Sequence, residues 1–173
     1  ALRTLLPTKR NKSKLYFNVR LFADTSRPLL TDGRHDFFEN TPYNINKACK
    51  LLDRVRVQQS ATDIILAFEK AFRLPNFDTI YLISDGMSTV GRSAEVEQMY
   101  YEIHRLNRAR RASIHTIGIY NGKNPLFLDL RLRVNGNEGI WKGFLRRLAE
   151  DNAGFFVGNF EPKFKAAPKK KKP

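Results

Sequence analysis

Segments with the pattern of β-strands alternate with segments with the pattern of α-helices along most of this 173-residue chain. Runs rich in branched and aromatic side chains predict strands, whereas an apolar residue at every third or fourth position predicts a helix. Chains that alternate in this way form a mostly parallel sheet with helices on both faces. The predicted fold class is therefore α/β, with a doubly wound sheet.

The predicted elements follow one another in a regular order. Strands are expected at 14–23, 79–84, 113–120, 126–134 and 155–158. Helices are expected at 43–55, 60–72, 93–111 and 140–154. Gly154 closes the last helix, because glycine readily takes the left-handed conformation found at helix ends. Pro28 predicts an edge position or a loop after the first strand.

The positive charge of the chain is concentrated at its two ends. The whole chain has 31 Lys and Arg against 17 Asp and Glu, a net charge of +14. Residues 1–20 and 163–173 each hold six basic residues and no acidic one, so the body between them is close to neutral. We expect one domain over 1–162 and a disordered lysine-rich tail over 163–173, because the tail has little to bury.

Composition limits the cellular setting only in part. No stretch of about 18 apolar residues is present, which predicts no transmembrane helix. No signal peptide is recognisable, and the compartment stays unknown. Cys49 is the single cysteine, which excludes an internal disulfide, and its helical pattern predicts a buried thiol.

Asp85 is the residue that most directly suggests a functional site. It follows the apolar strand 79–84 in the sequence YLISDG. In open α/β sheets ligands bind outside the carboxyl ends of the strands, so this carboxylate predicts a ligand or metal site. The alternative is that Asp85 and Gly86 only form a turn, with the carboxylate bonded to loop amides.

The order of these segments resembles the von Willebrand factor type A family, and its bacterial members most of all. The resemblance rests on the sequences YLISDG, IHTIGI and FLRRLAEDNAGFFV, together with ATDIILAFEKAF and the strand FNVRLFA. It covers about residues 1–158. It implies a doubly wound sheet with a metal-ion-dependent adhesion site at one edge. It also implies a non-enzymatic module that binds other proteins.

Three motifs build the adhesion site in this family: Asp-x-Ser-x-Ser after the first strand, Thr at the start of a helix, and Asp after the fourth strand. The resemblance assigns Thr62 to the second motif and Asp85 to the third. Mg²⁺ takes about six oxygen ligands, so such a site accepts an acidic side chain from a partner. We expect Mg²⁺ only if the first motif is supplied.

The first motif is where the chain departs from the family. ADTSRP at 23–28 contains an Asp and a Ser, but it follows the wrong strand and lacks the second Ser. Ser60 and Ala61 stand where the family has two glycines. We expect the central first strand, between 14–22 and 79–84, to be absent from this chain. An upstream segment, a partner's strand, or a rearranged 126–134 would fill its place.

A sheet that lacks its central strand would be unstable. Buried backbone groups left without partners cost about 1–3 kcal/mol each. The total stability of a domain is only about 5–15 kcal/mol. The sequence therefore predicts a protein partner or an upstream segment that completes the sheet.

The basic residues support an alternative function. The candidate polyanion-binding residues are Lys169, Lys170, Lys171 and Lys172 of the tail and Arg108, Arg110 and Arg111 near the end of a predicted helix. They would make the chain a basic structural subunit of a nucleic-acid or ribonucleoprotein assembly, or attach it to an anionic surface. A solvated tail and cations that suit the helix dipole are the simpler interpretation.

No enzymatic activity is predicted. A third hypothesis makes Asp85 a nucleophile or phosphoacceptor, but no base and no phosphate-binding motif accompanies it. The three histidines show no metal-ligand spacing. His104 is predicted to be solvated, and His115 to be an interior histidine with its hydrogen bonds satisfied.

Overall fold

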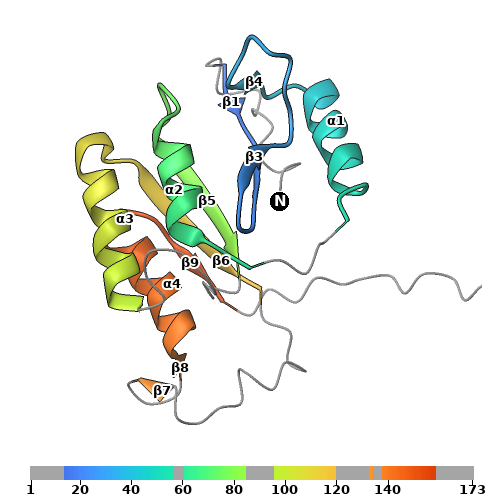
Figure 1. The fold of residues 1–173 in the computed structure, drawn as a ribbon. Coiled ribbons are helices and arrows are strands. Elements are labelled where there is room, and N and C mark those ends of the chain that lie inside the picture. The colour runs from blue at the N-terminus through green and yellow to red at the C-terminus, as the bar shows by residue number, and fades with distance from the viewer. Residues whose placement is uncertain (1–13, 57–60, 85–95, 120–132, 135–137, 159–173) are drawn as a thin grey trace, which may run out of the picture. The chain divides into compact units, whose positions relative to one another are not determined.

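The computed structural model describes residues 14–56, 61–84, 96–119, 133–134 and 138–158. Helices and a parallel sheet are both present, which confirms the mixed α/β class (Figure 1). The chain divides into two compact units, and each is described by itself. The first unit comprises residues 1–77 and 88–110, and the second comprises 78–87 and 111–173.

The second unit is built on a three-stranded parallel sheet. Strand β6 (Ser113–Gly118) is central, with β5 (Thr79–Ser84) on one side and β9 (Phe156–Val157) on the other. Helix α4 (Ile140–Glu150) packs against this sheet (Figure 1). The strands predicted at 79–84, 113–120 and 155–158 are thus confirmed, the last two in shorter form.

The core of the second unit lies between β6 and α4. Ile114, Leu145 and Leu148 are fully buried there. The buried hydroxyl of Thr116 donates a 2.7 Å hydrogen bond to the carbonyl oxygen of Leu145, which satisfies a polar group inside the core. This bond fixes the height of α4 along β6.

A short antiparallel pair precedes α4. It joins β7 (Arg133–Val134) to β8 (Glu138–Gly139). Only the last two residues of the strand predicted at 126–134 are described, and they pair within this hairpin. The rest of that prediction lies outside the described residues.

The end of α4 refines the prediction for Gly154. The residue with left-handed backbone is Ala153, at φ 52°, while the N–H of Gly154 bonds the Ala149 carbonyl at 2.9 Å. Glycine is required at 154 for a different reason, because the backbone of β6 lies against it. A Cβ at this position would stand 1.9 Å from the carbonyl oxygen of Ile114.

We expect Gly154→Ala to destabilise the protein by about 1–3 kcal/mol, because α4 and β6 must separate to admit the methyl group. The matched control is Gly143→Ala, where a Cβ meets nothing within 4 Å. Inside a helix that change stabilises by about 0.5–1 kcal/mol. Urea unfolding of both variants measures the two effects. Equal midpoints for the two variants would show that the contact at Gly154 is unimportant.

The first unit contains two small antiparallel pairs. Strand β1 (Tyr16–Phe17) pairs with β4 (Phe38–Glu39), and β2 (Arg20–Phe22) pairs with β3 (Ser26–Pro28). The helices of this unit are α1 (Pro42–Leu52), α2 (Ile64–Phe72) and α3 (Val96–Arg110).

The prediction of one continuous strand over 14–23 is wrong. The chain changes partners at Asn18, whose side-chain amide bonds the Asp36 carbonyl, while the Val19 carbonyl accepts the N–H of Leu29 at 2.7 Å. The segment therefore enters two separate pairs. Pro28 lies at the end of an edge strand, as predicted.

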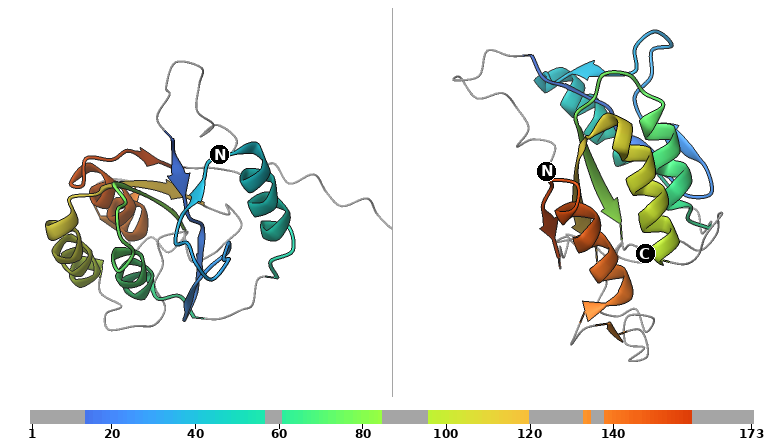
Figure 2. Two further views of the ribbon diagram at one scale, coloured as in Figure 1. Left: turned by 90° about the horizontal axis from the view of Figure 1, so that it is seen from above. Right: turned by 90° about the vertical axis from the view of Figure 1, so that its left-hand side faces the viewer.

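The three helices of the first unit confirm their predicted positions with shifted ends. Helices α2 and α3 pack side by side (Figure 2). Ile64 and Phe68 of α2 are buried, as are Met99 and Ile103 of α3. Helix α2 begins at Ile64, later than predicted, because Asp63 caps it.

The doubly wound arrangement stays a prediction. Among the described residues, β2 pairs with β3 alone and β5 pairs with β6 alone. No described strand joins the segment at 14–22 to the parallel sheet. The absence of a central strand beside β5 also stays a prediction.

Candidate functional site: the open face of the parallel sheet

The described residues do not assemble the predicted metal site. Asp85 lies outside them, although Ser84 ends β5 directly before it. Thr62 precedes the cap of α2, where the Asp63 carboxylate accepts the N–H of Leu66 at 2.9 Å. Within the described ranges, no group of three or more His, Cys, Asp or Glu side chains could hold a metal ion. The Mg²⁺ site at Asp85 and Thr62 therefore stays a prediction.

One face of the parallel sheet carries apolar side chains that remain exposed. We call it the open face, and its residues are Tyr81, Ile83, His115, Ile117, Phe155 and Val157. In the register of the strands Tyr81 lies beside His115, and Ile117 lies between Ile83 and Val157. Tyr81 is 45% exposed, Ile83 48%, Phe155 49% and Val157 38%.

The opposite face is covered. Leu82, Ile114 and Thr116 alternate with the residues of the open face and are buried. Helix α4 packs on this side, where the guanidinium of Arg146 also lies 5.3 Å from the ring centre of Phe156. Parallel sheets are normally covered on both faces, so a sheet covered by a helix on one face is unusual.

The edge of this sheet is also open on one side. Strand β5 pairs with β6 over all six residues. No strand among the described residues pairs with the outer edge of β5. A strand of another polypeptide can add to such an edge through backbone hydrogen bonds.

An aromatic cluster lies at the centre of the open face. The ring of His115 lies 4.7 Å from that of Tyr81 and 4.1 Å from that of Phe155, measured between centres. The N–H of Phe155 donates a 3.0 Å hydrogen bond to Nδ1 of His115. Nδ1 therefore carries no proton, and the neutral ring holds its proton on Nε2. The hydrogen bond of His115 is satisfied as predicted, but the ring lies on an open face.

Burial lowers the pKa of His115 below its ordinary value of 6.5. The unfolded chain therefore binds the proton more readily than the folded chain. Stability that is present above pH 6.5 falls as the pH drops below that value. The hydrogen bond from Phe155 is lost when Nδ1 becomes protonated.

We expect His115→Asn to reduce the loss of stability between pH 7 and pH 5, because its side-chain oxygen still accepts the Phe155 N–H without titrating. Urea unfolding at several pH values measures this slope. Asp32→Asn is the control, since the hydrogen bond from His35 holds the pKa of Asp32 well below its usual range. The protonation of that carboxylate affects stability only at about pH 4 and below, so Asp32→Asn should leave the slope between pH 7 and pH 5 unchanged. If stability fell equally with pH in wild type and in His115→Asn, His115 would not be the group whose protonation destabilises the protein.

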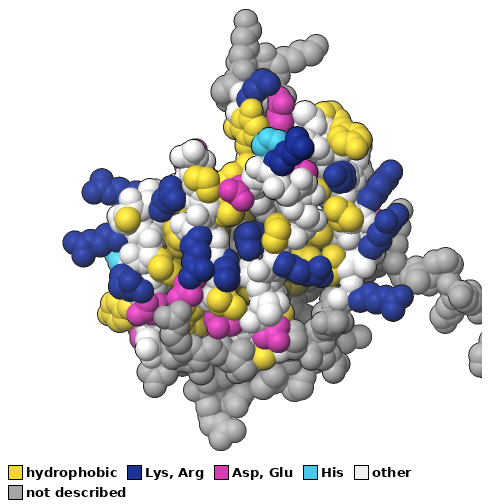
Figure 3. Space-filling model, turned by 45° about the horizontal axis from the view of Figure 1, so that its top comes forward, with side chains coloured by type: hydrophobic (Ala, Val, Ile, Leu, Met, Phe, Trp, Pro, Cys, Tyr) yellow, Lys and Arg dark blue, Asp and Glu magenta, His cyan; other side chains and the backbone are white. Residues whose placement is uncertain are grey.

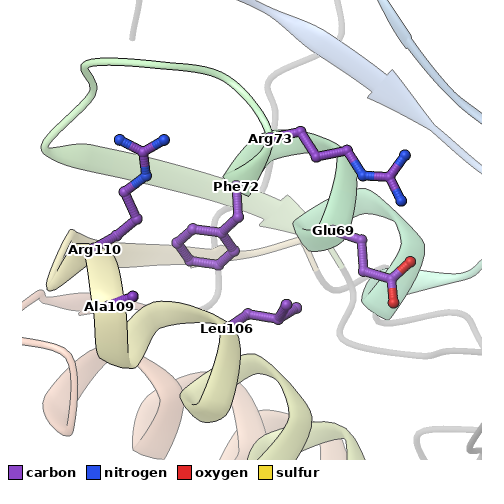
Figure 4. Close-up of a pocket in the computed structure, with 6 residues that line it drawn as sticks. All are labelled: Glu69, Phe72, Arg73, Leu106, Ala109 and Arg110. Atoms are coloured by element: carbon purple, nitrogen blue, oxygen red, sulfur yellow. The ribbon is translucent and has the colours of Figure 1, made fainter.

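A hollow of about 330 Å³ between α2 and α3 has no arrangement of side chains typical of a catalytic site. It is lined by Glu69, Phe72, Arg73, Leu106, Ala109 and Arg110. Figure 4 shows the Phe72 ring pointing from α2 toward α3, with the Arg73 and Glu69 side chains directed away. Three of these six residues are apolar and three are charged, and this described lining contains no pairing of a nucleophile with a base.

The candidate polyanion-binding arginines are in different situations. Arg110 donates a 2.9 Å hydrogen bond to the Leu74 carbonyl, and its guanidinium lies 5.4 Å from the ring centre of Phe77. Arg108 and Arg111 are exposed, and Arg111 has left-handed backbone at φ 55° after the end of α3. Lys169, Lys170, Lys171 and Lys172 lie outside the described residues.

Comparison with known proteins gives little further information. No family model matches the sequence, and no curated protein is significantly similar to it. The crystal structure of an uncharacterized membrane spanning protein from Vibrio fischeri is similar with a TM-score of 0.34 and 20% identity, over 85% of this chain and 69% of that chain. A similarity at this level supports no conclusion. Within the described part of the chain, no helix has the length and apolarity needed to cross a membrane.

Proposed function

We propose that this chain is a non-enzymatic protein-interaction module of the von Willebrand factor type A kind. The open face of the parallel sheet is the observation on which the proposal depends. Another polypeptide covers that face and adds a strand to the outer edge of β5. The partner is therefore a protein segment with apolar side chains.

The energy available on the open face supports this proposal. Complete burial of a large apolar side chain contributes about 1.5–3 kcal/mol. Tyr81, Ile83, Phe155 and Val157 are each about half exposed. Covering all four would contribute about 3–6 kcal/mol, to which backbone hydrogen bonds along β5 would add.

The chemistry of the open face favours protein over a charged ligand. His115 is its sole titratable residue besides Tyr81, and the ring is neutral. A face without formal charge offers nothing to bind a phosphate or a carboxylate. Shape and apolar burial are then the basis of recognition.

The resemblance to the adhesion family agrees with two features of the second unit. Its strands are parallel, in the order β5, β6, β9, and β5 ends one residue before Asp85. We propose Asp85 and Thr62 as remnants of the family's metal site. Mg²⁺ binding needs ligands beyond these two, and we assign it no part in the interaction at the open face.

The proposal predicts where a photoreactive side chain will capture a partner. Replacing Tyr81 by p-benzoyl-L-phenylalanine, in the cells that produce the protein, should give a discrete covalent adduct with one polypeptide after irradiation. A second substitution, Ile83→Asp, should abolish that adduct, because it places a charge on the open face.

The matched control places the same photoreactive residue at Tyr101, a tyrosine of α3 that is 62% exposed. This position should give no discrete adduct. Circular dichroism confirms that each variant is folded. Equal adducts at the two positions, or an adduct at 81 that survives Ile83→Asp, would overturn the proposal.

A further inference from the structure

A line of positive charge runs along one side of α1 in the first unit. We call it the basic stripe, and it consists of the cations Lys47, Lys50 and Arg54 together with the tyrosine that precedes them, Tyr43. Their spacing of four, three and four residues places them on one side of a helix. Arg54 lies in the turn that continues α1, where its N–H bonds the Leu51 carbonyl at 3.1 Å. Figure 3 shows Lys and Arg side chains spread over much of the visible face.

The charges of the basic stripe are not compensated within the described residues. All three cations are exposed, and no ion pair joins them to a described carboxylate. Helix α1 contains no acidic residue. Like charges three or four residues apart destabilise a helix by about 0.2–0.5 kcal/mol per pair. The helix dipole accounts for cations near the C-terminal end. Asp53, the exposed C-cap residue of α1, lies between Lys50 and Arg54 in the sequence but forms no ion pair with either of them.

An aromatic ring and a hollow accompany these charges. The side chain of Tyr43 is 75% exposed at the first turn of α1. A hollow of about 390 Å³ follows the stripe, and its described lining comes entirely from α1 and the turn after it. Asn46 and Leu51 complete that lining. Exposed cations and an exposed ring are thus arranged along one line.

We propose that the basic stripe binds single-stranded nucleic acid. Lys47, Lys50 and Arg54 bind successive phosphates, and one base stacks on the ring of Tyr43. Stacking on an exposed aromatic ring beside basic side chains is how proteins hold single strands without reading their sequence. A duplex keeps its bases stacked within itself, so it offers no base face to Tyr43.

The stripe fits an anionic membrane less well. Helices that bind membrane surfaces place a row of large apolar side chains beside their cations. Here the exposed side chains beside the cations include Tyr43, the polar Asn46 and the acidic Asp53, and no row of large apolar side chains. The inference goes beyond the proposed protein interaction and concerns the other unit of the chain.

Salt dependence tests the phosphate contacts. Binding of the full chain to a fluorescein-labelled oligouridylate is measured by fluorescence anisotropy over a range of salt concentrations. For single strands the slope of log K against log salt changes by about 0.7 for each phosphate contact. The variant Lys47→Gln, Lys50→Gln, Arg54→Gln should therefore lower the slope by about 2.

The matched control removes three other exposed cations of the first unit: Arg27→Gln, Arg34→Gln, Arg73→Gln. It has the same net charge, and it should keep a steeper slope than the stripe variant. An equal or larger loss in the control would overturn the proposal. So would a wild-type chain that fails to bind the oligonucleotide.

Stacking is tested separately at Tyr43. Tyr43→Ala should weaken binding by about 10- to 100-fold at constant salt slope, and Tyr43→Phe should restore it. A Tyr43→Ala variant with wild-type affinity would overturn the stacking contact. Equal binding of a duplex, of phosphatidylserine vesicles or of polyglutamate would overturn the choice of ligand. Each of these results leaves the crosslinking at Tyr81 unaffected.

Discussion

The second unit depends on the close contact between β6 and the segment that follows α4. Gly154 approaches the Ile114 carbonyl so closely that no side chain fits between them. The residues after it enter β9, and Thr116 ties the same strand to α4 through Leu145. This contact fixes both the order of the three strands and the face that α4 covers. It therefore also determines which face of the sheet is left open.

An open apolar face sets requirements on the residues that form it. A histidine at its centre would usually titrate near neutral pH, and a charge there would oppose any apolar partner. Burial lowers the pKa of His115, and its neutral ring accepts the Phe155 N–H and lies against two neighbouring rings. The cluster thus preserves an uncharged surface under the conditions in which a partner would bind. Partial burial of its four most exposed apolar side chains also limits the cost of leaving them uncovered.

The sequence predicts the helices and parallel strands well, because their apolar periodicity reflects burial directly. It fails at 14–23, where the pattern is strand-like throughout but Asn18 redirects the chain to a second partner. It cannot reveal the open face, because Tyr81 and Ile83 have the apolar character of strand residues that a helix would cover. The need for glycine at 154 is equally hidden, since it arises from a strand about forty residues away. The basic stripe could have been found from its helical spacing alone.

The two proposed surfaces respond to solution conditions in opposite ways, for reasons that lie in their composition. Salts that are excluded from protein surfaces strengthen apolar burial, and so favour contact with the open face. Added salt weakens the attraction between the basic stripe and phosphates, because each counterion released into a more concentrated salt solution gains less entropy. Each surface belongs to one unit and needs no residue of the other. A chain of this composition can therefore hold a protein and a polyanion by independent interactions, with ionic strength deciding which of them is the stronger.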